Sequence, residues 1–449
     1  MTGLSEADLP LDSGSQDESV PLTPDFEQRL PHVTRDDMNR FVAEDLYYAM
    51  EEFIPGAEDD EIPPVHAEIN EEMYAQGADM QGIDWEHQLL NRKQTRAKRV
   101  EEFVNYLSLG DEYEEDGISI DSVQDNREFF DFKYARLDQR CSIGHFQLRN
   151  LLWATSKNDV YYVFEDTVRH WSPQLCQSQE VLNVSLANSP QSLVFKISSM
   201  ACAYNILFVG GSMGEFACRR LDNINSPVHY GITTDHSNGI ANHVNITNNR
   251  RGEIQAVVSS NDRKTRYINM ERMTIEKTMS FPFAVNCSAL SPQKELLCVV
   301  GDSTTTLVVD AITGKTVMDW DEHHDFSFAC CWSPDGKMLA TGNQDKTTRI
   351  YDIRFPSEAL YVLGGKVGAI RSLQYSRDGK FLIAAEPIDF VHIYDTTDYK
   401  SSQVIDMFGD IAGVNITPDD QALFIANTDH RQGGIFEFQR IHSDFFSIL

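Results

Sequence analysis

The sequence predicts an all-β fold, a ring of seven four-stranded blades that follows an acidic N-terminal extension. The first observation is a phrase that recurs from Cys141 to the C-terminus, in which short apolar runs alternate with turns rich in Gly, Asp and Asn. Seven copies give a period of about 45 residues, the length of a four-stranded propeller blade. The second is an uneven charge: the formal net charge is −31, and residues 1–91 contain 23 acidic but only three basic side chains. We therefore expect a seven-bladed β-propeller behind an acidic extension.

Residues 323–354 carry the clearest copy of the repeated phrase, HHDFSFACCWSPDGKMLATGNQDKTTRIYDIR. Its apolar runs have the length and the residue types of strands, and they predict strands at 326–332, 338–342 and 347–353. The segments SPDGK and NQDK lie between these runs, and their Asp-Gly and Asn/Asp residues favour tight hairpin turns. This copy therefore predicts three consecutive antiparallel strands of one blade.

The other six copies follow the same plan with lower fidelity. Three of them keep the turn residues and the apolar runs, and they span residues 285–310, 368–395 and 412–438. Three weaker copies begin near His145, Leu193 and His243. Because every copy predicts the same short strands and turns, a ring of similar blades accounts for the whole segment.

The last blade lacks a fourth strand of its own after residues 433–440. The segment EFFDFKYAR at 128–136 alternates apolar and polar residues, so it can supply that strand and close the ring, which removes an open sheet edge. We expect cleavage at Glu128 to destabilise the propeller and cleavage near Met80 to leave it intact. The predicted domains are an acidic disordered extension (1–83), a helical and basic linker (84–127) and the propeller (128–449).

The acidic extension is expected to be mostly disordered. It combines a high net charge with Pro, Ser and Gly residues and few β-branched ones, so it cannot bury enough apolar surface to fold alone. Residues 35–54 and 84–109 have apolar side chains at helical spacing. These two stretches therefore predict short helices within or directly after the extension.

Composition and motifs exclude several function classes. No apolar run approaches the roughly 18 residues of a membrane span, and a pI near 4.7 disfavours direct binding to nucleic acid or anionic membranes. The acidic N-terminus differs from a secretory leader, so we expect free cysteines in a reducing compartment. The sequence contains no phosphate-binding loop, no HExxH motif and no zinc-spaced Cys/His pattern. We expect no cofactor, no metal and no enzymatic activity.

The segment 323–354 resembles a WD40 repeat, with a Tyr-Asp pair at 351–352 in place of Trp-Asp. The resemblance implies a structural hydrogen-bond network within the blade, whose members are His324, Thr341, Asp345 and Tyr351. A hydroxyl, a His and an Asp are also the components of a hydrolase triad. The structural interpretation is favoured because Thr341 lies in mid-strand and not on a nucleophile elbow.

A closer resemblance covers the chain from about Met80 onward. The phrases MQGIDWE (80–86), RKQTRAKRVEEFVNY (92–106), HFQLRNLLWATSKNDVY (145–161) and AEPIDFVHIYD (385–395) carry it. They are similar to a family of fungal and plant WD40 proteins that includes the exportin-interacting WD40 proteins of plants. The resemblance implies a non-enzymatic scaffold or adaptor for protein–protein interaction, with exportin as a partner, that moves between the nucleus and the cytoplasm.

The linker segment 92–109 contains two candidate targeting signals. A basic cluster predicts a nuclear-import patch, formed by Arg92, Lys93, Arg96, Lys98 and Arg99. The apolar residues that follow have the spacing of a leucine-rich export signal, formed by Val100, Phe103, Leu107 and Leu109. Such a signal binds as a helix whose apolar side chains enter a groove. The alternative is an amphipathic helix docked against the propeller rim, with its basic face solvated or paired with the acidic extension.

A second functional hypothesis concerns the end of the best copy. The stretch MLATGNQDKTTRIYDIR resembles the box with which WD40 substrate receptors dock on the adaptor of a cullin-type ubiquitin ligase. In that interpretation Asp352 and Arg354 contact the adaptor. The alternative is a WD-type dipeptide followed by an arginine of no special role.

Overall fold

Strands dominate the part of the chain that the structure describes. The computed structural model describes residues 67–109, 118–186, 192–223 and 225–441, within a unit that spans Asp59–Leu449. The predicted disorder of residues 1–66 and the predicted helix at 35–54 lie outside the described residues. The all-β prediction of seven blades is confirmed, since five four-stranded sheets each form one blade and a nine-stranded sheet contains the other two.

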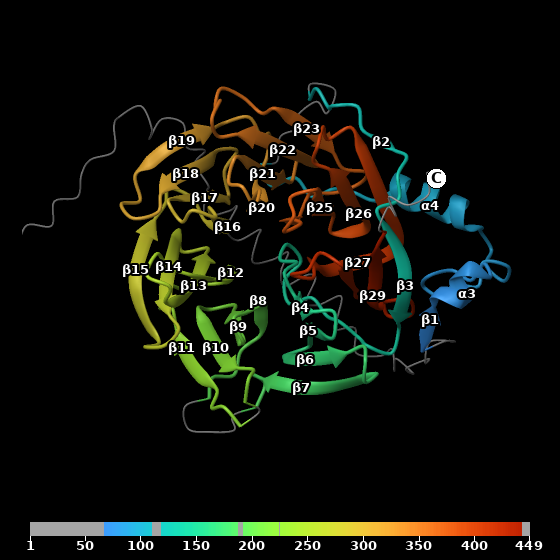
Figure 1. Ribbon diagram of the computed structural model, residues 1–449, viewed down its shortest axis with the longest axis horizontal. Coiled ribbons are helices and arrows are strands. Elements are labelled where there is room, and N and C mark those ends of the chain that lie inside the picture. The colour runs from blue at the N-terminus through green and yellow to red at the C-terminus, as the bar shows by residue number, and fades with distance from the viewer. Residues whose placement is uncertain (1–66, 110–117, 187–191, 224, 442–449) are drawn as a thin grey trace, which may run out of the picture. The chain divides into compact units, whose positions relative to one another are not determined.

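Five blades are each built from four consecutive antiparallel strands (Figure 1). Blade 1 has β4 (Leu152–Ser156), β5 (Asp159–Phe164), β6 (Thr167–Ser172) and β7 (Gln177–Asn183). Blade 2 has β8 (Ile197–Ala203), β9 (Ile206–Gly211), β10 (Glu215–Arg220) and β11 (His229–Ile232). Blade 3 has β12 (Ala241–Asn248), β13 (Ile254–Ser260), β14 (Lys264–Asn269) and β15 (Thr274–Ser280). Blade 4 has β16 (Val285–Leu290), β17 (Leu296–Gly301), β18 (Thr306–Asp310) and β19 (Thr316–Trp320). Blade 5 has β20 (Ser327–Trp332), β21 (Met338–Asn343), β22 (Thr347–Asp352) and β23 (Tyr361–Gly364).

Blades 6 and 7 share one long strand. Blade 6 has β24 (Ser372–Tyr375), β25 (Phe381–Ala385), β26 (Ile388–Asp395) and the first part of β27 (Ser401–Ile416). From Ile411 onward β27 instead pairs with β28 (Ala422–Asn427) as the innermost strand of blade 7. The change of sheet occurs beside Gly409, whose φ of 109° favours glycine and where a Cβ would lie 2.7 Å from Asn427 Oδ1.

Blade 7 is completed by a strand from the opposite end of the propeller. β28 pairs with β29 (Gly434–Arg440), and β29 pairs antiparallel with β3 (Phe130–Arg136), which precedes blade 1 in the chain. The innermost strands β4, β8, β12, β16, β20, β24 and β27 contact one another in that order, and β27 contacts β4. The ring is therefore closed by pairing between β3 and β29.

The hydrophobic core lies between neighbouring blades and not inside any one of them. For example, Tyr267 and Met279 of blade 3 pack with Leu297 and Val299 of blade 4 in one buried cluster. Similar clusters join blades 4 and 5, 5 and 6, and 6 and 7. Because each blade needs its neighbours to bury its apolar faces, the ring folds as a unit.

The two faces of the ring carry different loops. The top face bears the loops that connect consecutive blades and the loops between the second and third strands of each blade. The bottom face bears the turns between the first and second and between the third and fourth strands. Residues 344–346 and 365–371, for example, are top loops of blade 5, and residues 249–253 are a bottom turn of blade 3.

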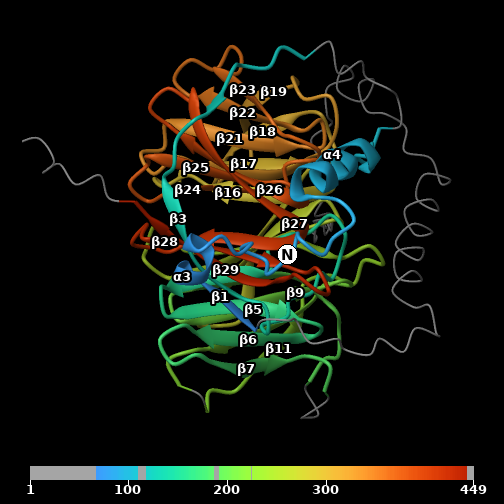
Figure 2. The same cartoon turned by 90° about the vertical axis from the view of Figure 1, so that its right-hand side faces the viewer.

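Residues 67–127 add short elements to blades 5–7. They are β1 (Glu68–Asn70), α3 (Glu71–Ala75), α4 (Arg92–Glu102) and β2 (Gln124–Asp125). β1 pairs antiparallel with β3, and β2 pairs parallel with β27. Figure 2 shows α4 on one face of the ring and α3 at the rim beside β1. None of the described helices is long and apolar enough to span a membrane.

The packing of β1 changes one expectation. Ile69 is completely buried in the cluster between blades 6 and 7, where it joins Phe130 and Phe436. Residues 67–79 therefore contribute to the core, although their composition resembles that of the acidic extension. We now expect a chain shortened to Met80 to be less stable than the intact chain, because it loses a buried isoleucine and the strand that covers β3.

Candidate functional site

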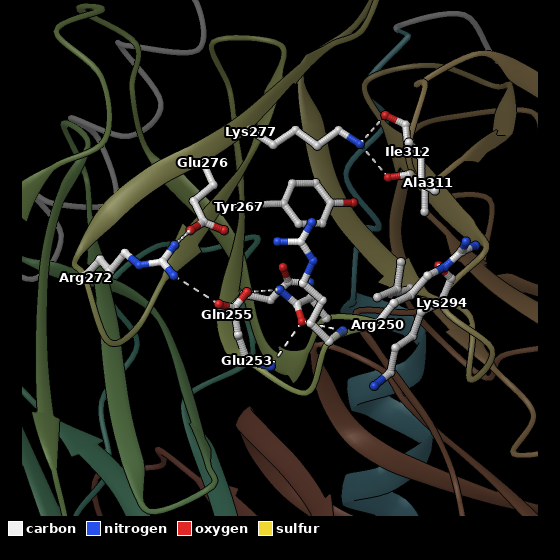
Figure 3. Close-up of a pocket in the computed structure, with 13 residues that line it drawn as sticks. Arg250, Glu253, Gln255, Tyr267, Arg272, Glu276, Lys277, Lys294, Ala311 and Ile312 are labelled. Atoms are coloured by element: carbon white, nitrogen blue, oxygen red, sulfur yellow. Dashed lines mark hydrogen bonds and ion pairs between the residues drawn. The ribbon is translucent and has the colours of Figure 1, made fainter.

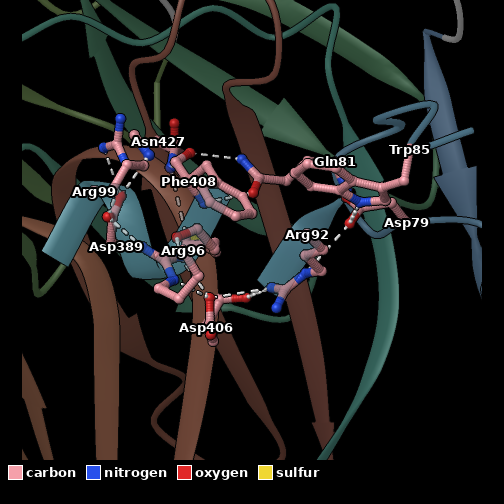
Figure 4. Close-up of polar contacts among 12 residues, drawn as sticks. Asp79, Gln81, Trp85, Arg92, Arg96, Arg99, Asp389, Asp406, Phe408 and Asn427 are labelled. Atoms are coloured by element: carbon pink, nitrogen blue, oxygen red, sulfur yellow. Dashed lines mark hydrogen bonds and ion pairs between the residues drawn. The ribbon is translucent and has the colours of Figure 1, made fainter. Parts of the chain in front are cut away.

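Residues 92–108 of the linker lie across the top face at blades 4–6, whereas residues 121–125 bond to the outermost strands of blades 5 and 6. Helix α4 begins with a capping box, in which Asn91 and Gln94 each bond to the other's backbone N–H. Arg92, Arg96 and Arg99 recur at helical spacing, so they share one face of α4. Figure 4 shows these three side chains directed at the propeller. The basic face of α4, and not an apolar face, is therefore the face that docks.

Two aspartates of blade 6 receive the arginines of α4. Arg99 makes two parallel hydrogen bonds to the Asp389 carboxylate, at 2.9 Å from Nε and 2.8 Å from Nη2. Arg96 bridges Asp389 and Asp406, and Arg92 bonds to Asp406 Oδ1 at 3.1 Å. The hydrogen bond to Asp389 raises the pKa of Arg99, so the pair stays ionised. Paired, bidentate geometry offsets much of the cost of burying these charges.

Aromatic rings of the propeller pack against the arginines of α4. The Arg96 guanidinium lies 4.2 Å from the ring centroid of Phe408 and 4.6 Å from that of Phe390. The Trp85 ring packs 5.4 Å from Phe408 on the other side. Cation–π contacts gain strength when the cation is desolvated, and the Arg96 side chain is only 13% exposed. Charge pairing and ring contact therefore act on the same residue.

The residues of the predicted import patch take part in this contact, and their role in nuclear import stays a prediction. Carboxylates of blade 6 hold Arg92, Arg96 and Arg99, and Arg92 also lies 3.6 Å from Asp79 of the predicted acidic extension. Of the two lysines, Lys98 is exposed and lies 3.6 Å from Glu102 of the same helix, and Lys93 is also exposed. In the docked helix the arginines are more covered than the lysines, with side-chain exposures of 36% for Arg92, 13% for Arg96 and 37% for Arg99.

The export-signal residues do not share a helical face. Helix α4 ends at Glu102, and Phe103 is its extended C-cap residue. Phe103 packs against the buried cluster of Val367, Ile388 and Phe390, whereas Val100 is 43% exposed. Leu107 and Leu109 lie beyond the helix and are half-buried. The predicted helix-in-groove geometry is therefore absent from the docked linker.

Hydrogen bonds explain why the chain leaves the helix after Glu102. The Asn105 side chain donates to the Gln344 carbonyl oxygen at 2.8 Å and accepts from Gln344 Nε2 at 2.9 Å. Asn105 Oδ1 also accepts from the Ala369 N–H, and the Ser108 N–H donates to Asp325 Oδ2 at 2.9 Å. These partners lie on top loops of blades 4–6, so residues 103–108 bind as an extended segment.

The structural network of blade 5 forms around His323 and not the predicted His324. His323 Nδ1 lies 2.9 Å from Asp345 Oδ2, and its Nε2 lies 2.9 Å from Thr341 Oγ1. His324 contributes its backbone N–H to Asp345 instead. Burial alone would raise the pKa of Asp345, but the charge and hydrogen bond of His323 lower it. Two consecutive histidines made this register ambiguous in the sequence.

Tyr351 takes a packing role beside that network. Its ring stacks on Trp320 of blade 4, with centroids 4.4 Å apart. Within the described residues its hydroxyl is buried without a hydrogen-bond partner. Tyr351 therefore joins two blades through ring contact, whereas His323, Thr341 and Asp345 form the polar network.

A half-buried carboxyl, Asp302 on a top loop of blade 4, gives a pH-dependent prediction. Burial raises the pKa of Asp302 to about 6, a hydrogen bond from Asn286 opposes the rise, and Asp325 adds to it. An unfolded aspartate has a pKa near 3.9, so this group destabilises the fold above pH 6, and its contribution becomes more favourable as the pH falls from 7 to 4.

Asp302→Asn is therefore expected to raise the free energy of unfolding at pH 7.5 by about 1 kcal/mol, a value reduced for partial exposure. The gain should shrink at pH 5, where Asp302 is largely protonated. Urea unfolding at both pH values measures this. The exposed Asp319→Asn serves as control, and an equal gain in that variant contradicts the assignment to Asp302.

The predicted ligase-adaptor pair lies at the end of β22 on the bottom face. Arg354 folds back on Asp352, with its Nε 2.8 Å from Oδ1 and its Nη2 2.6 Å from Oδ2. The hydrogen bond from Arg354 lowers the pKa of Asp352. The Arg354 side chain is 52% exposed, and the neighbouring Phe355 is also exposed. Arg354 is thus accessible, whereas Asp352 is buried and holds the arginine in one orientation.

A cavity on the bottom face between blades 3 and 4 was not predicted (Figure 3). It has a volume of about 490 Å³ and is built from bottom turns of both blades together with β15. Its charged and polar lining includes Arg250, Arg251, Glu253, Gln255, Tyr267, Arg272, Glu276, Lys277 and Lys294. Adjacent arginines in the NNRRG turn at 248–252 were the available signal in the sequence. Among the described residues no group of His, Cys, Asp and Glu has the arrangement of a metal site.

Comparison with known proteins agrees with this architecture. Residues 314–352 match the family model described as WD40: WD domain, G-beta repeat. An uncharacterized protein of Schizosaccharomyces pombe, C4G3.03, is 24% identical over 318 residues, which cover 65% of this chain and 87% of that protein. The serine-threonine kinase receptor-associated protein of Dictyostelium discoideum is 35% identical over 75 residues, or 17% of this chain and 26% of that protein.

Two further similarities extend the comparison. The U3 small nucleolar RNA-associated protein 15 homolog of Xenopus tropicalis is 24% identical over 146 residues, or 32% of this chain and 28% of that protein. A chain in the crystal structure of the mitotic checkpoint complex is similar in fold, with a TM-score of 0.57 and 16% identity over 73% of this chain and 97% of that chain. The matched repeat lies in blades 4 and 5, and the closed ring and the network of blade 5 are features that this chain shares with WD40-repeat proteins.

Proposed function

We propose that the chain is a non-enzymatic scaffold for protein–protein interaction, present in the nucleus and the cytoplasm. The observation that carries the proposal is the docking of residues 92–108 on the top face at blades 4–6. A helix is held there by Arg–Asp pairs, and an extended segment is held by Asn105 and backbone hydrogen bonds. Docked helices and extended segments are also recurring forms in which one protein binds a peptide of another.

The names of similar proteins support an assembly role. One relative is a receptor-associated protein, and others are a small nucleolar RNA-associated protein and the COMPASS component SWD3. Each matches only part of this chain, so each supports a general role and not a particular partner. The nucleolar term in one name also supports a nuclear location.

The scaffold proposal is tested by chemical cross-linking of the tagged full chain in its own cells, at its natural abundance, followed by mass spectrometry. We expect stoichiometric partners with cross-links to propeller loops in a nuclear or cytoplasmic fraction. A chain that sediments as a free monomer in both fractions, without cross-linked partners, contradicts the proposal.

Shuttling through exportin is the finer form of the same proposal, and it requires release of α4. An import receptor can bind the three arginines of α4 only after they leave Asp389 and Asp406. An exportin can bind Phe103 only after that side chain leaves its buried cluster. The tagged Asp389→Ala variant is therefore expected to change its nuclear fraction, and inhibition of exportin should increase that change. An unaltered distribution in both experiments contradicts shuttling by these residues.

The role as ligase receptor is supported by the exposed, preoriented Arg354. We expect Arg354→Ala to abolish co-purification of a cullin-ligase adaptor, because the charge and the fork geometry at this position are lost. Lys337→Ala is the matched control, since Lys337 is also exposed and paired with an aspartate on a bottom turn of blade 5. Adaptor recovery that is equal in both variants, or absent in the wild-type chain, contradicts this role.

A further inference from the structure

The cavity between blades 3 and 4 has a charge opposite to that of the chain. Five basic side chains and two acidic ones line it, in a protein whose formal net charge is −31. The local excess of positive charge lies on the bottom face, away from the top loops that bind α4. Anionic groups are therefore attracted to this cavity although the chain as a whole repels them.

The basic side chains fall into two groups. Arg272 is neutralised by Glu276 at 2.8 Å and Glu253 at 3.1 Å, and Lys277 donates to the carbonyl oxygens of Ala311 and Ile312. The other three cations are held less tightly: Arg250 lies 3.8 Å from the exposed Glu295, Lys294 donates to the Asn248 side chain, and Arg251 has no ion pair within the described residues. Arg250 and Arg251 come from the β12–β13 turn, and Lys294 comes from the facing turn of blade 4. The cavity is thus a cationic cleft between two blades.

Tyr267 supplies an unused hydrogen-bond donor. Figure 3 shows its ring in the middle of the lining residues. The side chain is almost completely buried, and its hydroxyl has no hydrogen-bond partner within the described residues. Burial raises the pKa of Tyr267, so the hydroxyl keeps its proton and can donate it to an acceptor. A buried donor without an acceptor is costly, and a ligand oxygen would remove that cost.

An apolar wall completes the cavity. Ile312, at the turn between β18 and β19, is 59% exposed, and Leu290 and Ala311 line the cavity beside it. A free inorganic anion gains no free energy by covering this apolar surface, whereas an apolar amino-acid side chain does. The volume is also in the range of sites that bury several side chains or a small ligand.

We propose that this cavity is the docking site for an acidic peptide segment of a partner protein, in which carboxylates flank an apolar side chain. The carboxylates face Arg250, Arg251 and Lys294, one acceptor oxygen reaches the Tyr267 hydroxyl, and the apolar side chain covers Ile312. The inference rests on the proposed scaffold function and adds to it the chemistry of one partner.

The test uses the full chain and a fluorescein-labelled peptide, Glu-Asp-Leu-Asp-Glu, in fluorescence anisotropy at low salt. We expect saturable binding to the wild-type chain. The double variant Arg250→Glu/Arg251→Glu should weaken binding by at least about tenfold, because two attractive charges become repulsive. Tyr267→Phe should weaken it by about tenfold, the effect of one hydrogen bond to a charged acceptor, and should raise the unfolding temperature of the free chain, because it removes a buried donor that has no acceptor within the described residues.

Matched controls separate the cavity from general electrostatics. Lys380→Glu/Arg431→Glu makes the same change in net charge at exposed sites on other blades and should retain binding within about twofold. The peptide with Ser in place of Leu should bind more weakly, and inorganic phosphate should not compete.

Four results overturn the inference: no saturable binding, equal loss in both double variants, unchanged binding in both cavity variants, or full competition by phosphate. A cross-linked partner that the Arg250→Glu/Arg251→Glu variant retains overturns only the cavity assignment. The scaffold proposal fails separately, when the wild-type chain has no partner at all.

Discussion

A chain that begins at residue 138 is expected to lose the cooperative unfolding transition of the propeller. That truncation removes β3, in which Phe130, Phe132 and Ala135 are buried between blades 6 and 7. Truncation of each buried phenylalanine costs about 3–5 kcal/mol. The loss of two of them and of the pairing with β29 therefore approaches the total stability of a typical domain, about 5–15 kcal/mol.

Two longer chains serve as controls for this prediction. The chain 67–449 retains every described element up to β29 and should unfold like the full chain. The chain 128–449 retains β3 but loses β1 and α4, so its transition should move to lower temperature and stay cooperative. Circular dichroism during thermal unfolding compares the three chains. A chain 138–449 that unfolds as cooperatively and at the same temperature as 128–449 would show that β3 does not close the ring.

The second large effect is expected from Asp389→Ala, which should release α4 from blade 6. Asp389 is almost completely buried, receives hydrogen bonds from Arg96, Arg99 and the Gly409 N–H, and has a φ of 66°. The substitution leaves two arginines without their shared partner and places alanine in a left-handed conformation. Removal of one partner from a buried pair costs about 3–5 kcal/mol. The arginines of α4 can reach water after release, so about 3 kcal/mol is expected here.

Limited proteolysis with trypsin measures this release directly, because α4 contains the cleavage sites Arg92, Arg96 and Arg99. A docking equilibrium weakened by about 3 kcal/mol predicts about a hundredfold faster cleavage within α4. Asp389→Asn separates charge from backbone strain, since asparagine tolerates the same conformation. Asp319→Ala, an exposed aspartate of β19, is the matched control. Cleavage of α4 at equal rates in Asp389→Ala and wild type would contradict the ion-pair account.

The sequence was sufficient for features that repeat or that depend on neighbours in the chain. Strands in 323–354 followed from alternating apolar runs and from Asp-Gly turns, and the structure has β20, β21 and β22 at those positions. The same copy also predicted the structural network of blade 5. The histidine of that network was assigned one residue too late, because His323 and His324 are neighbours with the same side chain. Local pattern carries this information because hairpin turns and strand periodicity are short-range properties.

The linker is a segment whose conformation and contacts the local sequence pattern does not determine. The basic and apolar residues of 92–109 fit a targeting signal, a solvated helix or a docked helix equally well by sequence. The choice among them depends on Asp389, Asp406 and Phe408, about 300 positions further along the chain. Neither the charge nor the spacing of α4 specifies which carboxylates the fold will bring beneath it.

By itself, the sequence determined the number of blades, the order of the strands and the acidic character of the N-terminal part, because these follow from composition and short-range periodicity. Only the tertiary structure decided which face of α4 is buried, where the helix ends and that Tyr267 lies beside a cationic cleft between two blades. Those properties arise from side chains of different blades that meet only when β3 and β29 close the ring, and long-range contacts of this kind leave no local pattern.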